Sequence, residues 1–576
     1  MSDGALIARV VPDVTGLDKQ FDYLVPESLL DRVHVGSLVR VPLGPRRVRG
    51  WVVELDTGPT ESLRPIAAVL GVGPSPEVVS LAAWAAHRWC GRMRSVLKSA
   101  SAATLVPSVV RPSRGSGRVD SGVTQVDSWP PSGVHRIAPC ADRLALILSA
   151  ASRGPIIVCT PSIDDAARLD ARLRRRGLRV AVMPRDWAVA AGGCDVVVGS
   201  RTAVWAPCPD LAGIVVLDEH DETLQEERSP TWHARDVAIE RTRRAGVPCW
   251  LVSPSPSLEA IEWAGGVVHH PSRLDERAGW PLVEAVDLGA GDAPISTMVT
   301  RSLLDAAREP DRRVVMVLNT KGRARRLVCK ACSQRARCER CGAAVSLDSA
   351  GVLHCARCQA TRPPVCASCG STRLVSVGLG ISRLRDDLEA ALKRPVLEVS
   401  AQTPDEIVES APEATVFIGT EAVLHRVRRA DAVVFLDFDD ELLAPRFRAH
   451  EQAMTLLIRA ARLVGPRAQG GRVLVQTRHP DHEVLVAALH ADTERWSVAE
   501  RDRRRLLDLP PECALARVSG EGASSWLAGL DQAVVFGSSS AGWLLRAGDA
   551  DTLADMLAAL GPRPADVRVH VDPHRV

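Results

Sequence analysis

Residues Cys329 to Cys369 read CKACSQRARCERCGAAVSLDSAGVLHCARCQATRPPVCASC. The spacing of the cysteines in this stretch is the most specific motif of the chain. The stretch holds eight cysteines in four C-x2-C pairs, separated by spacers of 5, 13 and 7 residues. A C-x2-C turn brings two thiolates to one side of a tight loop, which is half of a tetrahedral zinc shell. The sequence therefore predicts a small module with two structural Zn²⁺ ions, whose fold depends on the metal.

Eight cysteines can be shared between two zinc ions in more than one way, and spacing alone leaves the pairing open. We expect a nested arrangement, in which the inner pairs close a short hairpin loop and the outer pairs close around it. A disulfide framework would need an oxidising compartment, and the N-terminus has no signal peptide pattern. The first expected zinc set is Cys329, Cys332, Cys366 and Cys369, and the second is Cys338, Cys341, Cys355 and Cys358.

Short apolar runs lie on both sides of the cysteine stretch and alternate with helical patterns. Such runs indicate the buried strands of parallel α/β sheets. The cysteine stretch interrupts the second series just after its first run. The first series is Pro155–Cys159, Val180–Met183, Val196–Val198, Ile214–Leu217 and Pro248–Val252, and the second is Val314–Leu318, Val396–Val399, Thr415–Ile418, Ala432–Leu436 and Arg472–Gln476.

The chain of 576 residues is long enough for about four domains. We predict a multidomain α/β protein that begins with a β-rich unit followed by a helical pattern over Val78–Leu97. A stretch rich in Ser, Gly, Pro and Arg follows and indicates a linker. The predicted parts are a β-rich domain at 1–108, a linker at 109–134, a first lobe at 135–300, a second lobe at 301–484 with the zinc insertion at 329–369, and an α+β domain at 485–576.

Composition and charge narrow the class of protein. The chain is 46% hydrophobic and 24% charged, values typical of a soluble globular protein, so a cytoplasmic location is expected. No apolar run approaches the roughly 18 residues of a membrane span. Net charge is only +3, yet 11 Lys or Arg and 2 Asp or Glu between Lys321 and Leu374 give that block +9. Such a block favours polyanions, unless it is simply a solvated basic face.

Four groups of residues resemble, in order, the PriA family of bacterial replication restart proteins, also called primosomal protein N′. Phe21-Asp-Tyr-Leu24 with Gly36-Ser-Leu-Val-Arg-Val-Pro42 resembles the N-terminal domain of that family, which binds a 3′ DNA end. The cysteine block with Gly370-Ser-Thr372 resembles its zinc module, and Val475-Gln-Thr-Arg-His-Pro480 the end of its second RecA-like helicase lobe. The first lobe is matched by Val198–Arg201, Leu217–Asp221, His233–Asp236 and Ser255–Glu259.

The ATPase motifs depart from this resemblance. Superfamily 2 helicases need a phosphate loop, G-x-x-x-x-G-K-[ST], in which backbone N–H groups and the Lys hold the phosphates. The corresponding stretch, His135–Leu146, reads HRIAPCADRLAL and has neither Gly nor Lys. None of the five lysines of the chain lies between Ser99 and Thr320. Arg143 is present there, but a guanidinium fork does not replace a compact ammonium group.

Two further motifs are altered, so we expect no catalytic residue. The acidic motif, Asp218-Glu219-His220, is one residue short of the family pattern, and its members are interpreted as relics. Leu463 and Pro466 stand where the last helicase motif of the family has arginines. Asp218 alone could still hold Mg²⁺. These losses put ATP and Mg²⁺ in doubt as cofactors, and the linker leaves no room for the winged-helix domain of the family.

The resemblance implies a pocket for a terminal nucleotide near the N-terminus. An aromatic ring offers a stacking face, a glycine allows close approach, and a cation balances a phosphate. On local sequence alone, the two aromatic residues are equally typical of strands that pack a small barrel. The residues implied are Phe21, Asp22, Tyr23 and Gly36, with Arg64 where the family has Lys.

The resemblance further implies a replication restart protein. It would recognise stalled or forked DNA and help assemble the primosome that reloads the replicative helicase, without unwinding DNA itself. The implied partners are forked and single-stranded DNA, the single-stranded-DNA-binding protein, primosome components and the replicative helicase, and the implied state is a monomer at the nucleoid. Two alternatives remain: an active ATP-dependent 3′-5′ DNA helicase with a divergent nucleotide site, and a zinc-ribbon nucleic-acid adaptor.

Overall fold

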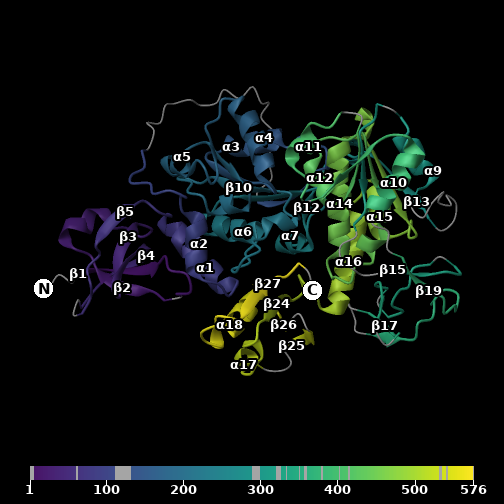
Figure 1. Ribbon diagram of the computed structural model, residues 1–576. Helices are drawn as coiled ribbons and strands as arrows, with labels where there is room; N and C mark the ends of the chain where they lie inside the picture. The colour runs from purple at the N-terminus through teal and green to yellow at the C-terminus, as the bar shows by residue number, and fades with distance from the viewer. Residues whose placement is uncertain are drawn as a thin grey trace. The chain divides into compact units, whose positions relative to one another are not determined.

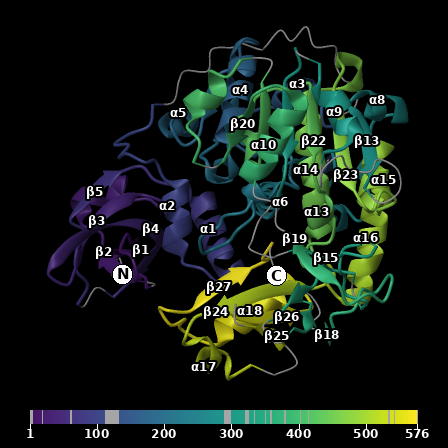
Figure 2. The ribbon, with the colours of Figure 1, turned by 45° about the vertical axis from the view of Figure 1, so that its right-hand side comes forward.

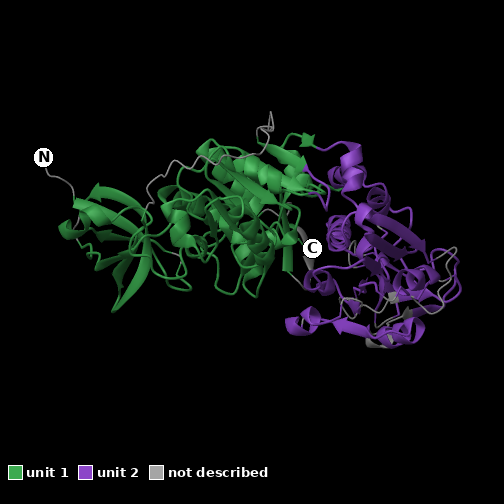
Figure 3. Cartoon of the chain, turned by 90° about the horizontal axis from the view of Figure 1, so that it is seen from above, with its two compact units in different colours: residues 1–135, 142–269, 507–574 green, residues 136–141, 270–506, 575–576 purple. Residues whose placement is uncertain are grey.

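The computed structural model describes most of the chain. The described residues are 5–17, 19–59, 62–110, 132–288, 299–309, 311–319, 326–332, 334–340, 342–348, 351–355, 360–377, 381–400, 402–412, 415–530, 535–539 and 542–574. The chain forms two compact units (Figure 3): unit 1 holds residues 1–135, 142–269 and 507–574, and unit 2 holds residues 136–141, 270–506 and 575–576. Within the described part, none of the helices has the length and apolar character needed to span a membrane.

Unit 1 begins with a five-stranded antiparallel barrel in the order β2-β1-β4-β3-β5 (Figure 1). The barrel closes where Leu24 N donates to Arg64 O and Ile66 N donates to Leu24 O, both at 3.0 Å. The expected helix at 78–97 is two helices, because the chain turns at Cys90 (φ 45°) and Gly91. The elements are β1 (Ala5–Pro12), β2 (Phe21–Leu24), β3 (Leu38–Leu43), β4 (Arg46–Gly58), β5 (Ala68–Gly71), α1 (Pro76–Arg88) and α2 (Met93–Ala100).

The first lobe is a seven-stranded sheet in the order β12-β6-β11-β10-β7-β9-β8, with the parallel pairings that the apolar runs predict. Its central strands are buried along their full length. The strands are β6 (Gly133–Arg136), β7 (Ile156–Cys159), β8 (Val180–Val182), β9 (Val196–Gly199), β10 (Gly213–Leu217), β11 (Cys249–Ser253) and β12 (Val268–His269), and the helices are α3 (Leu144–Ala151), α4 (Ile163–Arg174), α5 (Trp187–Gly192), α6 (Ala234–Ala245) and α7 (Leu258–Trp263).

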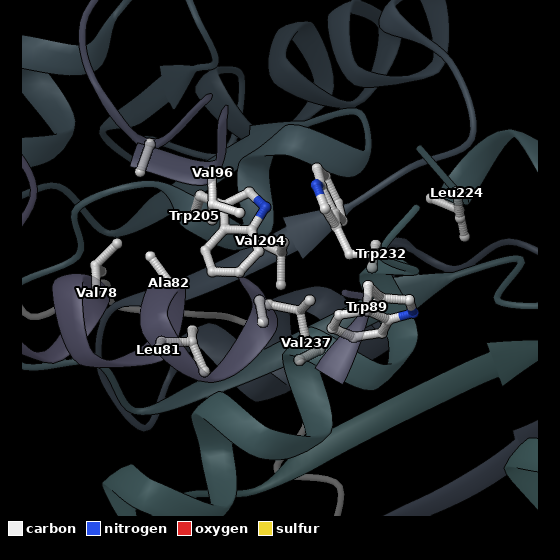
Figure 4. Close-up of a cluster of buried hydrophobic side chains, with 14 of the residues drawn as sticks. Val78, Leu81, Ala82, Trp89, Val96, Val204, Trp205, Leu224, Trp232 and Val237 are labelled. Carbon is white, nitrogen blue, oxygen red and sulfur yellow. The ribbon is translucent and has the colours of Figure 1, made fainter. Parts of the chain in front are cut away.

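A shared hydrophobic core joins the barrel helices to this lobe (Figure 4). Trp89, directly after α1, and Val96 of α2 lie in one cluster with Trp205 and Trp232 of the first lobe. The rings of Trp205 and Trp232 meet edge to face, with centroids 5.4 Å apart. Apolar burial of this size is the main stabilising contribution to a domain junction. The barrel helices and the first lobe are therefore one packed body.

Unit 2 is built on a six-stranded parallel sheet in the order β13-β23-β22-β14-β21-β20. β13 lies inside the range 135–300 expected for the first lobe, yet it pairs with β23 of this second sheet. The strands are β13 (Leu282–Asp287), β14 (Val314–Val317), β20 (Val396–Val399), β21 (Val416–Gly419), β22 (Ala432–Phe435) and β23 (Arg472–Thr477). The helices are α8 (Arg273–Ala278), α9 (Arg301–Ala307), α10 (Ile381–Leu392), α11 (Asp405–Glu409), α12 (Ala422–Arg426), α13 (Asp439–Leu442), α14 (Ala449–Val464), α15 (Glu483–Leu489) and α16 (Glu494–Leu507).

Two smaller parts complete the fold (Figure 2). The cysteine insertion of unit 2 follows β14 and carries two small sheets, β15-β19 and β16-β17-β18. The C-terminal part of unit 1 is an antiparallel sheet in the order β25-β26-β24-β27. The elements are β15 (Arg326–Cys329), β16 (Ser346–Leu347), β17 (Leu353–His354), β18 (Thr361–Arg362), β19 (Leu374–Val377), β24 (Ala514–Ser519), α17 (Ala523–Leu527), β25 (Val535–Ser539), β26 (Gly542–Ala547), α18 (Ala550–Ala559) and β27 (Arg568–Val571).

Candidate DNA-end interface, nucleotide-site relic and metal centre

Charged side chains form a row across β2, β1 and β4 of the barrel. Asp22, Arg9 and Glu54 stand opposite one another in the strand register. Arg9 Nε donates to Asp22 Oδ1 at 2.9 Å, and Arg9 Nη1 pairs with Glu54. The hydrogen bond to Asp22 raises the pKa of Arg9. Asp22 is 41% exposed, so its carboxylate is an oriented acceptor that faces solvent.

The two aromatic residues of β2 have different surroundings. Tyr23 is only 4% exposed and lies in the barrel core, where its hydroxyl donates to Pro42 O at 3.0 Å. Burial raises the pKa of Tyr23, and the positive charge of Arg64 opposes that shift. Phe21 is half-buried at the edge of the same core. Tyr23 is thus a packing residue, and Phe21 has the more accessible ring.

Arg64 and Gly36 occupy different places on the barrel. Arg64 is exposed, and its Nη1 donates to Gly44 O at 3.0 Å. Gly36 has φ 94° and donates its N–H to Val52 O. A Cβ at Gly36 would meet the Pro74 carbonyl oxygen at 1.8 Å, so no other residue fits there. The structure brings Tyr23 and Arg64 together, whereas the contacts of Gly36 are with other residues.

The two residues singled out in the expected nucleotide region of the first lobe form an ion pair with each other. Arg143 precedes α3, and Asp218 follows β10. Arg143 Nη1 donates to Asp218 Oδ2 at 2.9 Å, and only 16% and 3% of the two side chains are exposed. Asp218 has φ 55°, in the left-handed region that few non-glycine residues adopt, although Asp adopts it more often than most. Asp218 thus pairs with the guanidinium of Arg143, at the place where the lysine of a phosphate loop is expected.

A second carboxylate lies at the start of α3. Asp142 Oδ1 accepts the N–H of Leu144 at 3.0 Å, and Asp142 Oδ2 pairs with Arg172 at 2.7 Å. These bonds, led by the one from Arg172, outweigh burial and lower the pKa of Asp142. The N-terminus of a helix is where phosphate loops bind an anion. Here a side chain of the protein supplies that anion.

The other two members of the acidic motif are also engaged. Glu219 is fully buried and accepts the N–H and the hydroxyl of Ser257, each at 2.7 Å. Burial raises the pKa of Glu219, and the charge of Arg235 opposes that shift. His220 Nδ1 lies 2.7 Å from the Ser253 hydroxyl. Both residues therefore belong to the structural contacts that the segment after β10 makes with the end of β11 and with Ser257 beyond it.

The region of the last helicase motif is apolar where the family has arginines. Leu463 on α14 is 8% exposed and packs in the hydrophobic core of unit 2. Pro466 precedes the 3-10 turn Arg467–Gln469. Arg462 donates its Nε to Pro139 O at 3.2 Å, which ties it to a backbone carbonyl. Neither Leu463 nor Pro466 can stabilise charge on a phosphate.

Four cysteine sulfurs of the insertion lie within 4.8 Å of one another: those of Cys329, Cys332, Cys366 and Cys369. The Sγ atoms of Cys329 and Cys369 are 3.5 Å apart, and those of Cys332 and Cys366 are 3.6 Å apart. A tetrahedral zinc site with Zn–S bonds of about 2.3 Å has S–S edges of about 3.8 Å. The backbone N–H of Cys332 leads the effects that lower the pKa of Cys329 to about 6, which favours the thiolate. This cluster can hold a metal ion, and its geometry fits zinc. Its four cysteines are the outer set of the nested arrangement.

Half of the second predicted set can be placed. Cys338 and Cys355 are both buried in the core of the insertion, whereas Cys341 and Cys358 lie outside the described residues. Gly342 and Gly370, the glycines that follow cysteines in the insertion, have φ 73° and 72°. Because two of the four cysteines of the second set lie outside the described residues, the second metal site stays a prediction.

The basic block is divided between buried contacts and exposed charges. Arg335 pairs with Asp440, and Arg337 Nη2 lies 3.1 Å from His479 Nδ1. Arg362 donates to the Arg337 carbonyl at 2.9 Å. Arg335 and Arg337 hold the insertion against α13 and the segment after β23, whereas Arg362 joins two parts of the insertion. The exposed cations that the structure describes in this block are Lys330, Arg340 and Arg373.

Sequence reasoning missed Arg9 and Asp142. The signal for Arg9 was its alternation with apolar residues along β1, but its partners Asp22 and Glu54 depend on strand register. The signal for Asp142 was an Asp just before an apolar helical run, a usual helix-start pattern.

Comparison with known proteins finds relatives of this chain. A family model described as the 3′DNA-binding domain (3′BD) of PriA matches residues 9–102. Replication restart protein PriA of Haemophilus influenzae is 27% identical over 358 residues, 59% of this chain and 49% of that protein. The Bacillus subtilis protein of the same name is 26% identical over 63% of this chain and 49% of its own length. The aligned part thus spans about half the length of both relatives.

Other relatives match over more of their length. A protein of Mycobacterium tuberculosis named probable replication restart protein PriA is 29% identical over 88% of this chain and 85% of its own length. A solved DEAD box protein from Methanococcus jannaschii aligns at 10% identity over 66% of this chain and 87% of that one, with a TM-score of only 0.31. The chain is thus similar to replication restart proteins named PriA over up to 88% of its length, and its residues 9–102 match the 3′DNA-binding domain of PriA.

Proposed function

We propose that this protein recognises stalled or forked DNA through an exposed 3′ end and helps assemble the primosome that reloads the replicative helicase. The family match over residues 9–102 supports binding of a 3′ DNA end by the barrel. The accessible groups for this role are Phe21, Asp22 and Arg64. They combine a partly exposed ring, an oriented acceptor and a cation, the groups that stack and hydrogen-bond a nucleotide.

We further propose that the protein does this without unwinding DNA. The observation that carries this part is the Arg143–Asp218 ion pair. Phosphoryl transfer in related folds needs Mg²⁺ on such a carboxylate and a lysine on the phosphates. Here the carboxylate is paired with a buried guanidinium, and Asp142 occupies the N-terminus of α3. The two RecA-like sheets then serve as a scaffold.

The expected partners are the single-stranded-DNA-binding protein, primosome components and the replicative helicase, and the expected state is a monomer. Two Zn²⁺ ions would stabilise the insertion, one in the outer set of Cys329, Cys332, Cys366 and Cys369 and one in the inner set of Cys338, Cys341, Cys355 and Cys358. The exposed cations Lys330, Arg340 and Arg373 would add a second, electrostatic contact with DNA.

The experiment is a competition measured by fluorescence anisotropy at fixed salt. Labelled fork with a 3′ hydroxyl at the branch is displaced by unlabelled fork, by the same fork with a 3′ phosphate, and by linear duplex. The proposal expects the 3′-hydroxyl fork to compete best and linear duplex to compete poorly. Equal competition by all three would instead favour a general zinc-ribbon nucleic-acid adaptor.

A further inference from the structure

A cavity of about 1220 Å³ lies in unit 1 between the barrel and the first lobe. One wall comes from barrel loops, including Gly36 and Pro74. The other wall comes from the first lobe, including the segment 207–211 and α6. The start of α1 also lines the cavity. Because the barrel helices and the first lobe share one core, these walls belong to one packed body.

The first lobe contributes a buried cation to this cavity. Arg241 of α6 lines it and is only 9% exposed. Its Nη1 and Nη2 donate to the carbonyls of Val204 and Ala206 at 2.5 and 2.9 Å. Burial lowers the pKa of Arg241, and the charge of Glu77 is among the effects that oppose this shift. Among the residues that the structure describes, no carboxylate forms a direct ion pair with Arg241, so an anion bound beside this buried charge would be stabilised.

Two further cations line the cavity from opposite walls. Arg244 lies one turn after Arg241 on α6, and Arg32 comes from the barrel. The N-terminus of α1 adds positive potential, because the side chain of its N-cap residue Ser75 makes no capping hydrogen bond. Glu77 and Asp210 also line the cavity and oppose this potential.

Part of the remaining lining is apolar and offers packing surface to a polynucleotide strand. Prolines and aliphatic side chains such as Val69 and Val72 line the cavity, beside a few polar side chains such as His34 and Ser37. The apolar side chains offer packing surface to bases without the donors and acceptors that read base edges. Gly36, implied by the family resemblance to lie at the DNA end, also lines this cavity.

We propose that this cavity binds the phosphate backbone of the single strand whose 3′ end the barrel holds, with Arg32, Arg241 and Arg244 contacting phosphates. The proposal rests on the proposed function of the barrel. It adds the first lobe to the DNA-binding surface and gives that lobe a role that does not require ATP.

The test compares full-length variants by anisotropy with two labelled oligonucleotides that end in a 3′ hydroxyl, one of about four and one of about twelve nucleotides. Arg244→Gln has a matched control in Arg243→Gln, because both arginines lie on α6 and pair with Glu240, whereas only Arg244 lines the cavity. Arg32→Gln tests the opposite wall, and Glu77→Gln removes an opposing charge.

We expect Arg244→Gln and Arg32→Gln each to weaken binding of the longer oligonucleotide several-fold. Each should also reduce the slope of log K against log salt by about 0.7. Arg243→Gln should match the unchanged protein, and Glu77→Gln should bind more tightly. If Arg244→Gln and Arg32→Gln behave like Arg243→Gln while the short oligonucleotide still binds, the cavity proposal is wrong and the barrel function stands. If the unchanged protein binds neither oligonucleotide, both proposals are wrong.

Discussion

Arg143 Nη1 lies 2.9 Å from Asp218 Oδ2, in the part of the first lobe where a helicase would hold magnesium and phosphate. Both groups are largely buried, so each needs the other to offset its loss of hydration. The Asp218 carboxylate neutralises a buried arginine, so the pair has a structural role in this lobe.

The first prediction concerns the stability that this pair provides. Arg143→Met leaves the Asp218 carboxylate buried beside an apolar group, and Asp218→Asn leaves the Arg143 guanidinium buried beside a neutral amide. Each single change should cost about 3 kcal/mol and lower the Tm of unit 1 by several degrees. The double variant should lose far less than the sum, and scanning calorimetry of all four proteins measures the coupling.

The exposed pair Arg179–Asp195 of the same lobe is the control for that cycle. Its side chains are 57% and 31% exposed, so coupling there should be at most about 1 kcal/mol. Equal coupling in the two cycles would show that Arg143 and Asp218 are no more dependent on each other than a surface pair.

The second prediction is the metal content. Purified protein should carry about two zinc ions per chain, measured by mass spectrometry of the metal after desalting. Cys366→Ser should lose one of them, because it removes a ligand from the outer set. Cys194→Ser changes a buried cysteine outside the insertion and should keep both. Protein without zinc, or loss of zinc in Cys194→Ser alone, would contradict the assignment.

The third prediction concerns the DNA end. Asp22→Ala removes an exposed carboxylate that Arg9 holds in place, so affinity for forks with a 3′ hydroxyl should fall about tenfold, the equivalent of one good hydrogen bond. Asp56→Ala is the matched control, since Asp56 is an exposed carboxylate on β4 of the same barrel. Anisotropy at fixed salt compares the two variants, and an unchanged affinity in Asp22→Ala would remove this residue from the interface.

The fourth prediction is a pH dependence in unit 2. Glu483 lies beside His450 and Arg503, at 3.3 and 2.6 Å. Burial would raise the pKa of Glu483, but hydrogen bonds from His450 and Arg503 outweigh it and lower that pKa to about 2. A depressed carboxyl pKa adds stability that is present above about pH 4.5 and is lost as the pH falls towards 2.

Glu483→Gln should therefore lower the Tm at pH 7, and the difference from the unchanged protein should shrink as the pH falls below about 4.5. Glu27→Gln, on an exposed turn of the barrel, should show a small difference at every pH. A Tm difference for Glu483→Gln that stays constant down to pH 3 would mean that its charge adds nothing to folding.

Much of the fold could be predicted from the sequence because buried parallel strands leave continuous apolar runs. All ten runs that flank the cysteine stretch correspond to strands. β6 is buried but carries His135 and Arg136 in place of an apolar run, β12 has only two residues, and β13 is only partly buried, so none of the three could be found in this way. The order of the strands in each sheet could not be predicted either, because β13 pairs with β23, which lies almost two hundred residues later in the chain.

The parts of the candidate site that could be predicted are those whose residues lie close together in the sequence at a characteristic spacing. The outer cysteine set is an example, because each C-x2-C turn is local and only the pairing of turns was open. Pairs such as Arg143–Asp218 and Arg335–Asp440 depend on packing between distant segments, so no spacing indicates them. The core position of Tyr23 could not be predicted either, because the sequence around Tyr23 and Phe21 does not show which of the two rings is buried.

The central claim is that this protein recognises DNA forks on a helicase-like scaffold that does not turn over ATP. The most direct measurement is ATP hydrolysis by the purified full-length protein, with and without a fork carrying a 3′ hydroxyl, while fork binding is followed in the same samples. Asp218→Asn is assayed beside it. The account predicts intact fork binding with no DNA-stimulated hydrolysis in either protein. Fork-stimulated hydrolysis that disappears in Asp218→Asn would contradict it and reveal a working nucleotide site.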